Sequence, residues 1–403
     1  MKRTLTVISM LIIIAAIVVS GLPTSTPAAV AQEDEFVFGL IMVGPFDDNG
    51  WSEAHYEAGL YVEDTVEGAR MISIDRVNAA DSPELTMEDV VADMVEQGAQ
   101  LIIANSDDMK EDIEAVAPNY PDVAFIHVSG DGALTGEASE NLSNTMGRMI
   151  YGKMIAGCLA GLRTDTGSIG YLGPLVNAET RRLANSAYLG AKHCYEMKGG
   201  DPAELQFEVV WIGFWFFIEG VTLDPTEVAN DFFNGGADVV ISGIDTTQAL
   251  VVAGQRAAEG ENVYAIPYDY IDACGEAPDV CLGVPYFNWG PAYVEAVEKV
   301  QAGEWEQYWE WNPPNWEDLN DLDTTAVGFQ FGEILTDDEL EAVNGFIDAL
   351  AAGYAGEEGG LNLYAGPLNY QDGTEFVAEG EAATDEQIWY TEQLLEGMQG
   401  TSE

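Results

Sequence analysis

Basic residues are the scarcest component of this sequence. Its 403 residues include only 14 Lys and Arg against 70 Asp and Glu, which gives a formal net charge of −56. Binding to nucleic acid requires clustered Lys and Arg that neutralise phosphates, so the composition excludes nucleic acid as a partner. Acidic membrane surfaces are unfavourable for the same reason. A charge of this size favours solubility and indicates an extracellular environment rich in salt or cations.

Long hydrophobic runs are missing beyond the N-terminus. No later segment approaches the roughly 18 consecutive apolar residues that a membrane-spanning helix requires. Residues 1–31 begin with Lys2 and Arg3, continue with an apolar run from Thr6 to Val19 and end in Ala-Val-Ala. This pattern is typical of a cleaved export signal. We therefore predict a signal peptide over residues 1–31 and an extracytoplasmic location, with a retained membrane anchor as the alternative.

Cysteine and histidine are also rare, with four and three residues respectively. An even number of cysteines in an exported chain favours disulfides. Cys274 and Cys281 bound a short loop that contains Gly and Pro, so we predict a disulfide between them. Cys158 and Cys194 then pair by default. The spacing of these residues does not fit a zinc site, so no metal ion is expected.

Catalytic signatures are absent as well. The chain has no G-x-S-x-G nucleophile elbow, and no glycine-rich phosphate loop follows a predicted strand. The cysteines are expected to be paired, which removes them as nucleophiles. Two carboxylates suited to glycoside hydrolysis can always be found among 70 acidic residues, so they carry no information. We predict a protein that is not an enzyme and carries no cofactor.

The sequence instead shows buried strands that alternate with helices, in two consecutive series. Phe36–Val43 is a continuous apolar run that ends in Gly-Pro, and the run at Ser168–Leu172 also ends in Gly-Pro. Such runs are typical of strands in a parallel sheet that is covered on both faces. Further strands are predicted near 70–75, 101–104, 123–128, 207–212, 238–242 and 263–267. We therefore predict an α/β fold with two doubly wound parallel sheets, over about 36–143 and 146–283.

Helices are predicted between these strands and after them. The first spans Ser52 to Val66, and Ser82 is the expected N-cap of a helix over 83–97. Near the C-terminus we expect a helix from Asp337 to Ala352 and an acidic helix from Asp385 onward. Two doubly wound sheets in one chain form a cleft at the carboxyl ends of their strands, where ligands of α/β proteins bind.

Three tryptophans follow strands or crossovers that face this predicted cleft: Trp51, Trp215 and Trp289. Their flat apolar faces suit a planar ring, and each stacking contact contributes roughly 1 kcal/mol or more. Polar residues that follow strands can read the edge of such a ring by hydrogen bonds. They are Asp48, Ser106, Asp245 and Asp269. His55 lies one helical turn beyond Trp51, where it either contacts the ligand or packs behind the indole.

The chain resembles the basic membrane protein (BMP, PnrA-like) family of ABC-transporter substrate-binding proteins. The resemblance is carried by VGPFDDNGWSEAHYEAG, LIIANSDD, YPDVAFIHVSG, GYLGPLVNAETRRLANSAYLGAK, DPTEVANDFFNGGADVVISGIDTT, YAIPYDYID, VPYFNWGPAYVEAVEKVQAGEW and LYAGPLNYQDG, in this order. It implies a type I periplasmic binding protein, in which two Rossmann-like lobes are joined by a hinge of three crossovers. The lobes would comprise 36–143 plus 285–318 and 146–283 plus 325–403.

The resemblance also implies a ligand and a partner. Characterised members of the family bind purine nucleosides or bases, hold the ring between one aromatic residue from each lobe, and deliver it to a membrane permease. Trp51 and Trp215 match the two aromatic positions, while Trp289 matches a W-G-P at the crossover. Asp48, Ser106, Asp245 and Asp269 match polar contact positions. We expect a monomer.

Several departures from the family pattern leave the ligand open. Pro267 replaces a glycine, Ile271 replaces an acid, and the lysine that contacts ribose in some nucleoside binders has no clear counterpart in PYFNWGPAYV. A free purine base is therefore as compatible with the sequence as a nucleoside. Two further alternatives are a receptor for a sugar or another small polar ligand, and an extracellular α/β hydrolase.

Overall fold

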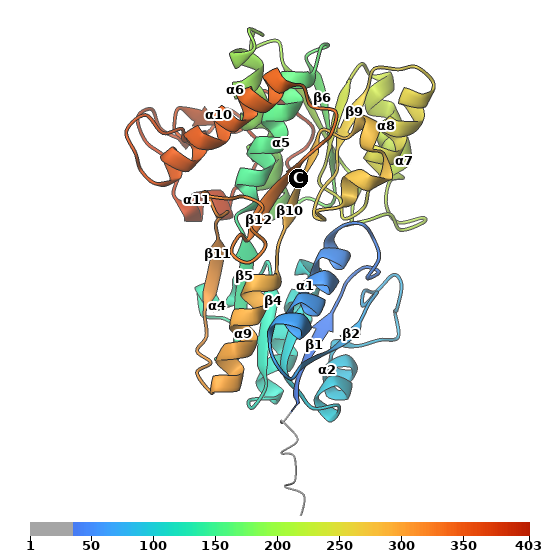
Figure 1. Cartoon of the computed structure of the whole chain (residues 1–403), viewed down its shortest axis with the longest axis vertical. Helices are drawn as coiled ribbons and strands as arrows, with labels where there is room; N and C mark the ends of the chain where they lie inside the picture. The colour runs from blue at the N-terminus through green and yellow to red at the C-terminus, as the bar shows by residue number, and fades with distance from the viewer. Residues whose placement is uncertain (1–34) are drawn as a thin grey trace, which may run out of the picture. The chain divides into compact units, whose positions relative to one another are not determined.

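The computed structural model describes residues 35–403 of the protein, which contain two parallel sheets with helices packed around them (Figure 1). The predicted signal peptide over residues 1–31 lies outside the described residues. Within the described part of the chain, each helix is too short or too polar to cross a membrane. The predicted α/β class is confirmed.

The first sheet has six strands in the order β11-β5-β4-β3-β1-β2, and all neighbouring strands run parallel. Its strands are β1 (Phe36–Ile41), β2 (Ala69–Ile74), β3 (Ala99–Ala104), β4 (Ala124–Val128), β5 (Leu142–Gly147) and β11 (Trp309–Asn312). The helices that accompany it are α1 (Trp51–Thr65), α2 (Met87–Glu96), α3 (Lys110–Val116), α4 (Gly132–Thr135) and α9 (Gly290–Ala302). Strand β1 lies between β3 and the edge strand β2, so the strand order reverses at β1, and ligands of open α/β sheets bind beside such a reversal.

The second sheet has five parallel strands in the order β15-β7-β6-β8-β9. They are β6 (Ser168–Gly173), β7 (Gln206–Trp211), β8 (Val239–Ser242), β9 (Tyr264–Ile266) and β15 (Met398–Gln399). The accompanying helices are α5 (Met149–Arg163), α6 (Ala178–Met197), α7 (Pro225–Asn234), α8 (Gln248–Ala258), α10 (Asp337–Tyr354) and α11 (Asp385–Trp389).

The chain passes between the two sheets more than once. After the second sheet, β10 (Gly283–Phe287) pairs antiparallel with β12 (Val327–Phe331), and between them α9 and β11 return to the first sheet. A small hairpin of β13 (Leu368–Asn369) and β14 (Glu375–Val377) precedes α11. These crossovers agree with the predicted hinge. The lobe boundaries at 36–143 plus 285–318 and 146–283 plus 325–403 stay a prediction.

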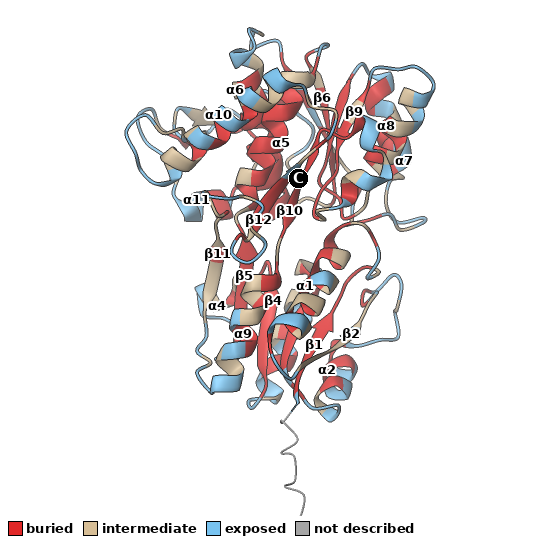
Figure 2. Ribbon diagram, viewed as in Figure 1, coloured by how far each residue is buried: buried red, intermediate tan, exposed pale blue. Residues whose placement is uncertain are grey.

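Burial explains why the sequences of the strands are continuous apolar runs. All residues of β1, β4 and β8 are buried, whereas β2 at the edge of its sheet is mostly half-buried (Figure 2). Helices cover both faces of a parallel sheet, so a central strand has no solvent-facing side and needs no alternating polar residues.

The N-cap predicted at Ser82 is wrong. Thr86 caps α2, and its side chain accepts a hydrogen bond from the backbone N–H of Asp89 at 3.1 Å. The Ser82 carbonyl instead accepts from Leu85 N in a turn. Thr86 is followed by Glu88 and Asp89 in the first helical turn, where negative charge is favourable, and the helix begins there.

The acidic helix expected from Asp385 to the C-terminus is also wrong. Helix α11 ends at Trp389, and β15 then joins the second sheet beside β7. The side chain of Asn185 on α6 forms two hydrogen bonds with the backbone of this segment. It accepts from Leu395 N at 3.1 Å and donates to the Gln393 carbonyl at 3.0 Å. Tertiary hydrogen bonds therefore replace those of a continued helix.

Both predicted disulfides are present in the structure. Cys158 on α5 is bonded to Cys194 on α6, with their Cα atoms 4.9 Å apart. Cys274 is bonded to Cys281, with their Cα atoms 5.6 Å apart. The first bridge ties together the two helices that follow each other along the chain at the start of the second sheet.

Candidate functional site

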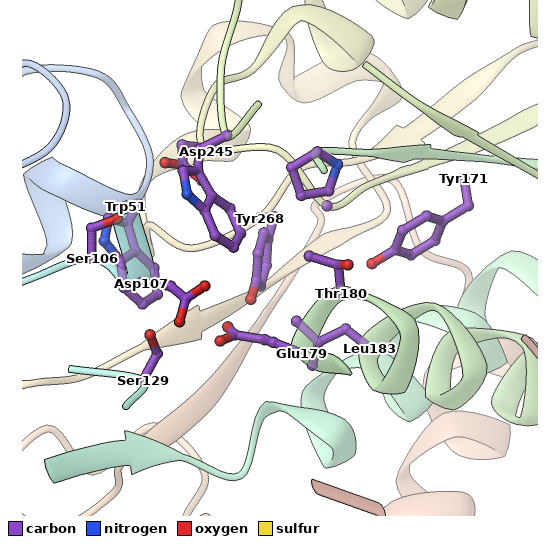
Figure 3. A pocket seen from close by; sticks show the side chains of 13 residues that line it. Trp51, Ser106, Asp107, Ser129, Tyr171, Glu179, Thr180, Leu183, Asp245 and Tyr268 are labelled. Carbon is purple, nitrogen blue, oxygen red and sulfur yellow. The ribbon is translucent and has the colours of Figure 1, made fainter. Parts of the chain in front are cut away.

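A cavity lies where loops from the carboxyl ends of both sheets meet (Figure 3). Figure 3 shows Trp51 on one side of it and the side chains of Glu179, Thr180 and Leu183 projecting from α6 on another. The lining residues are Trp51, Ser106, Asp107, Ser129, Tyr171, Pro174, Glu179, Thr180, Leu183, Trp215, Gly243, Asp245 and Tyr268.

The loop that leads into α1 is held by Asp48. Its carboxylate accepts hydrogen bonds from the backbone N–H groups of Gly50, Ser52 and Glu53 at 2.9–3.1 Å. These are unpaired donors at the start of a helix, so Asp48 acts as the cap and fixes where α1 begins. Burial raises the pKa of Asp48 to about 7, although the three N–H groups oppose the shift.

Trp51 is the first residue of α1 and only 7% exposed. Its Nε1 donates to the carbonyl of Asn105, after β3, at 2.8 Å. The indole meets the rings of His55, Phe287 and Trp289 edge to face, with centroids 4.7–5.4 Å apart. One hydrogen bond and three aromatic contacts therefore hold Trp51 in a single orientation at the cavity wall.

Trp215 approaches the same cavity from the second sheet, in the loop after β7. It is 9% exposed, and its carbonyl accepts from Asp245 N at 3.0 Å. Its indole Nε1 is buried and has no hydrogen-bond partner among the described residues. Trp215 is thus held by apolar packing and by its backbone, without a side-chain hydrogen bond among the described residues.

The two sheets touch directly through these loops. A Cβ atom at Gly50 would collide with the carbonyl oxygen of Asp245, so only glycine permits this approach. Asn49 donates to Glu276 at 3.3 Å, and Asn177 at the start of α6 donates to Asp107 at 3.2 Å. These contacts join the loops of the two sheets.

Three carboxyl groups, those of Asp107, Glu179 and Asp245, belong to the polar lining of the cavity. Burial raises the pKa of Glu179 to about 7, against the opposing effect of Arg182. Burial also raises the pKa of Asp245 well above its ordinary value, and the nearby Asp269 adds to the shift. A carboxyl that keeps its proton can donate as well as accept a hydrogen bond. The cavity can therefore pair with both donors and acceptors at the edge of a polar ring.

Four of the eight residues predicted for the site line this cavity: Trp51, Ser106, Trp215 and Asp245. The other four do not. Asp48 caps α1, as described above. His55 is fully buried, its Nδ1 lies 2.5 Å from the Tyr293 hydroxyl, and its ring stacks on Trp289 at 4.5 Å.

Trp289 and Asp269 both lie against the crossover strand β10. Trp289 stacks on Phe287 of the crossover strand β10 at 4.7 Å, behind Trp51. Asp269 is fully buried, and its backbone is hydrogen-bonded to Pro285 and Phe287 of the same strand at 3.1 Å. The structure therefore favours a role for Asp48, His55 and Trp289 in holding the cavity walls, whereas both carboxylate oxygens of Asp269 are buried without a hydrogen-bond partner among the described residues.

Comparisons with known proteins agree with this architecture. Residues 36–341 match the family model Bmp, described as ABC transporter substrate-binding protein PnrA-like. The chain belongs to this family. Family membership makes it the substrate-binding protein of an ABC transporter and not an enzyme, so the hydrolase alternative is set aside.

Two related proteins carry names that bear on the ligand. A purine-binding protein of Brucella abortus is 26% identical over 363 residues, which cover 89% of this chain and 92% of that protein. An ABC transporter glucose-binding protein of Haloferax volcanii, TsgA13, is 26% identical over 269 residues, which cover 66% of this chain and 61% of that protein.

Solved structures of ABC transporter solute-binding proteins share the fold. One from Aeropyrum pernix K1 has a TM-score of 0.62 at 15% identity and covers 79% of this chain and 92% of that chain. One from Conexibacter woesei has a TM-score of 0.57 at 19% identity and covers 79% of this chain and 97% of that chain. Members of the Bmp family act outside the cytoplasm, which agrees with the predicted location.

Several residues that line the cavity were not predicted from the sequence. Ser129 directly follows β4, and Tyr268 lies two residues after the end of β9, so the rule that ligands bind after strands could have found them. Glu179 and Thr180 lie in the first turn of α6. Tyr171 and Leu183 look like ordinary core residues in the sequence, and only the fold brings them to the cavity.

Proposed function

We propose that the protein is the extracytoplasmic receptor of an ABC importer for a purine nucleoside or purine base. The observation that carries the proposal is that Trp51 and Trp215, from opposite sheets, line one closed cavity. Two indoles that face one cavity suit a flat heterocycle, because each ring face can be covered by an apolar aromatic surface.

The polar lining supports the same ligand class. Asp245 and Glu179 offer carboxyl oxygens, and Trp215 offers a buried N–H without a partner. A purine carries ring nitrogens and exocyclic groups that accept and donate hydrogen bonds, so its edge can satisfy both kinds of group. The purine-binding relative from Brucella abortus adds support over most of the chain.

A sugar is the second candidate, because the Haloferax volcanii relative is named as a glucose-binding protein. Sugars also pack on tryptophan and hydrogen-bond to carboxylates. Four aromatic side chains line the cavity, Trp51, Tyr171, Trp215 and Tyr268, and this favours the flat ring over the hexose.

A direct test is to identify the small molecule that is carried through purification, by mass spectrometry after denaturation. Titration calorimetry of the ligand-free protein with adenosine, inosine, adenine, hypoxanthine, glucose and ribose then compares the two classes. We expect purine compounds to bind and glucose and ribose not to bind. Binding of glucose without any purine would overturn the proposal.

Delivery to a permease completes the proposed role. The receptor would work as a monomer that closes around its ligand and presents it to the permease in the membrane. Export by the signal peptide over residues 1–31 is part of the proposal, and N-terminal sequencing of the protein secreted by its cell tests it.

A further inference from the structure

Lys153 is a buried cation that lies behind the aromatic cavity. It belongs to α5, its side chain is 0% exposed, and it is not one of the residues that line the cavity. Its Nζ donates one hydrogen bond within residues 35–403, to the Ser242 carbonyl at 2.6 Å. An ammonium group carries three N–H donors, and lysine is almost never fully buried unless it is paired with an acid. The position of Lys153 therefore calls for a physical reason.

The ammonium group of Lys153 faces the backs of residues that line the cavity. Its Nζ lies 3.2 Å from the centroid of the Tyr268 ring and 5.6 Å from the centroid of the Tyr171 ring. Figure 3 shows both tyrosines at the cavity. The hydrogen-bond acceptor Ser242 is the last residue of β8 and directly precedes Gly243, which also lines the cavity. One side chain thus reaches wall segments that come from β6, from β8 and from the loop after β9.

The contact between Lys153 and Tyr268 is favourable and directional. A cation over the face of an aromatic ring is attracted by the ring quadrupole, and the attraction is stronger where water is excluded. The ammonium can keep this place over the Tyr268 ring because the Ser242 carbonyl holds it from another side. Lys153 therefore restricts the tilt of the ring and ties it to the end of β8.

The wall in front of Lys153 leaves little room for movement. A Cβ atom added at Gly243 would lie 2.6 Å from the Tyr171 hydroxyl oxygen, so the end of β8 packs tightly against this ring. Tyr268 is only 5% exposed. A shift of either ring or of the end of β8 would therefore change the shape of the cavity.

Fold stability does not account for the ammonium group. Burial lowers the pKa of Lys153 from 10.5 to about 7, and the charge of Asp269 opposes the shift. Asp269 acts on Lys153 through its charge, with no hydrogen bond between the two side chains among the described residues. Replacing a buried charge by an apolar side chain of similar volume is often neutral or stabilising. A methionine at this position would serve the core at least as well.

We propose that Lys153 is a positioning residue for ligand binding, which acts through Tyr268. Its ammonium group fixes the Tyr268 ring and the adjoining end of β8, and so sets the shape of the back wall of the cavity without touching the ligand. The inference goes beyond the proposed function, because it concerns every ligand that packs on Tyr268, whether that ligand is a purine or a sugar.

The main test is Lys153→Met, studied by titration calorimetry with adenosine, inosine, adenine, hypoxanthine, glucose and ribose. Each compound that binds the wild type should bind the variant at least tenfold more weakly, while the ligand-free variant should unfold at the wild-type temperature or above it. Unchanged affinity would overturn the inference. A lower unfolding temperature would also overturn it, because Lys153 would then serve the stability of the fold.

The outcome for the proposed function is separate. Binding of glucose alone would overturn the purine assignment, and the affinity of Lys153→Met for glucose would then decide this inference. If none of the six compounds binds the wild type, the purine assignment fails, and the unfolding temperature of the ligand-free variant decides the inference.

A matched control removes the same charge elsewhere. Lys192 on α6 lies over the ring of Tyr188, with Nζ 5.7 Å from its centroid, and neither residue lines the cavity. Lys192→Met should leave the affinity unchanged. A similar loss of affinity in Lys192→Met and Lys153→Met would show that net charge causes the effect, and would overturn the inference.

A double-mutant cycle tests the route through Tyr268. In a Tyr268→Leu background, Lys153→Met should weaken binding less than threefold further, because the ring that it positions is already missing. This coupling distinguishes positioning from a general structural role. A full tenfold loss in both backgrounds would show that Lys153 acts independently of Tyr268 and would overturn the inference.

Discussion

The two tryptophans that line the cavity are held in different ways. Trp51, on the first sheet's side, has its Nε1 bonded to the Asn105 carbonyl and three aromatic rings against its indole. Trp215, on the second sheet's side, lies in a loop, has no partner for its Nε1 among the described residues and is anchored through its backbone.

This difference indicates two kinds of wall. The Trp51 side is organised before the ligand arrives, because its polar group is satisfied inside the protein and its ring is packed. The Trp215 side keeps an unsatisfied donor, so it gains a hydrogen bond only when a ligand supplies an acceptor. Affinity then comes from stacking on a rigid surface on one side and from stacking plus polar recognition on the other.

The largest effect is expected for replacement of the rigid wall. Trp51→Ala should weaken ligand binding by about 1–3 kcal/mol through lost stacking and lower the free energy of unfolding by about 3 kcal/mol through the cavity it leaves. Titration calorimetry and urea unfolding measure the two quantities. Trp215→Ala is the matched variant, and it should weaken binding similarly while destabilising the protein less. Equal destabilisation by both variants would remove the distinction between the walls.

An intermediate effect concerns the ionisation of Glu179 on the second sheet's side. Burial raises its pKa to about 7, from an ordinary value of 4.5 that an unfolded chain would show. The folded protein therefore keeps this proton between about pH 4.5 and 7 while the unfolded chain releases it, so stability falls as the pH rises through this window.

Glu179→Gln stays neutral at every pH. The free energy of unfolding of the wild type should fall by an amount on the order of 2 kcal/mol as the pH rises through that window. The variant should not show this fall. Thermal unfolding at several pH values measures the difference, and ligand is left out so that binding does not contribute. A constant difference between variant and wild type would show that Glu179 does not titrate there.

The smallest expected effect concerns the N–H groups of the two indoles, which are tested by replacing each tryptophan with phenylalanine. Trp215→Phe keeps an aromatic face and removes only the unpartnered donor, so binding should weaken by about 1 kcal/mol while stability stays nearly constant. Trp51→Phe leaves the Asn105 carbonyl without its donor, so it should lower stability by about 1–2 kcal/mol. The reverse pattern in calorimetry and thermal unfolding would show that Trp215, and not Trp51, is the wall fixed by the protein.

Much of the fold could be predicted from the sequence. Buried strands such as β1 and β8 are short apolar runs bounded by turn residues, and this local pattern predicted them close to their observed bounds. The family resemblance, carried by ordered motifs, is confirmed over residues 36–341. The C-terminal segment was predicted poorly, because hydrogen bonds to Asn185 on α6 decide its path.

The site was predicted in part. Trp51 and Trp215 follow strands and reach the cavity as the strand-end rule requires. His55 and Trp289 have the same local signature, yet they stack on each other behind Trp51. Their side chains cannot be told from ligand contacts without the packing of α1 against α9 and β10.

By itself the sequence determined the α/β class, the pairs of cysteines and the aromatic residues at strand ends, since these follow from local periodicity, spacing and turn chemistry. Only the tertiary structure decided which of those residues face the cavity and which support it. It also brought Ser129, Glu179 and Tyr390 together, because they come from segments far apart in the chain that meet only when the two sheets close on each other.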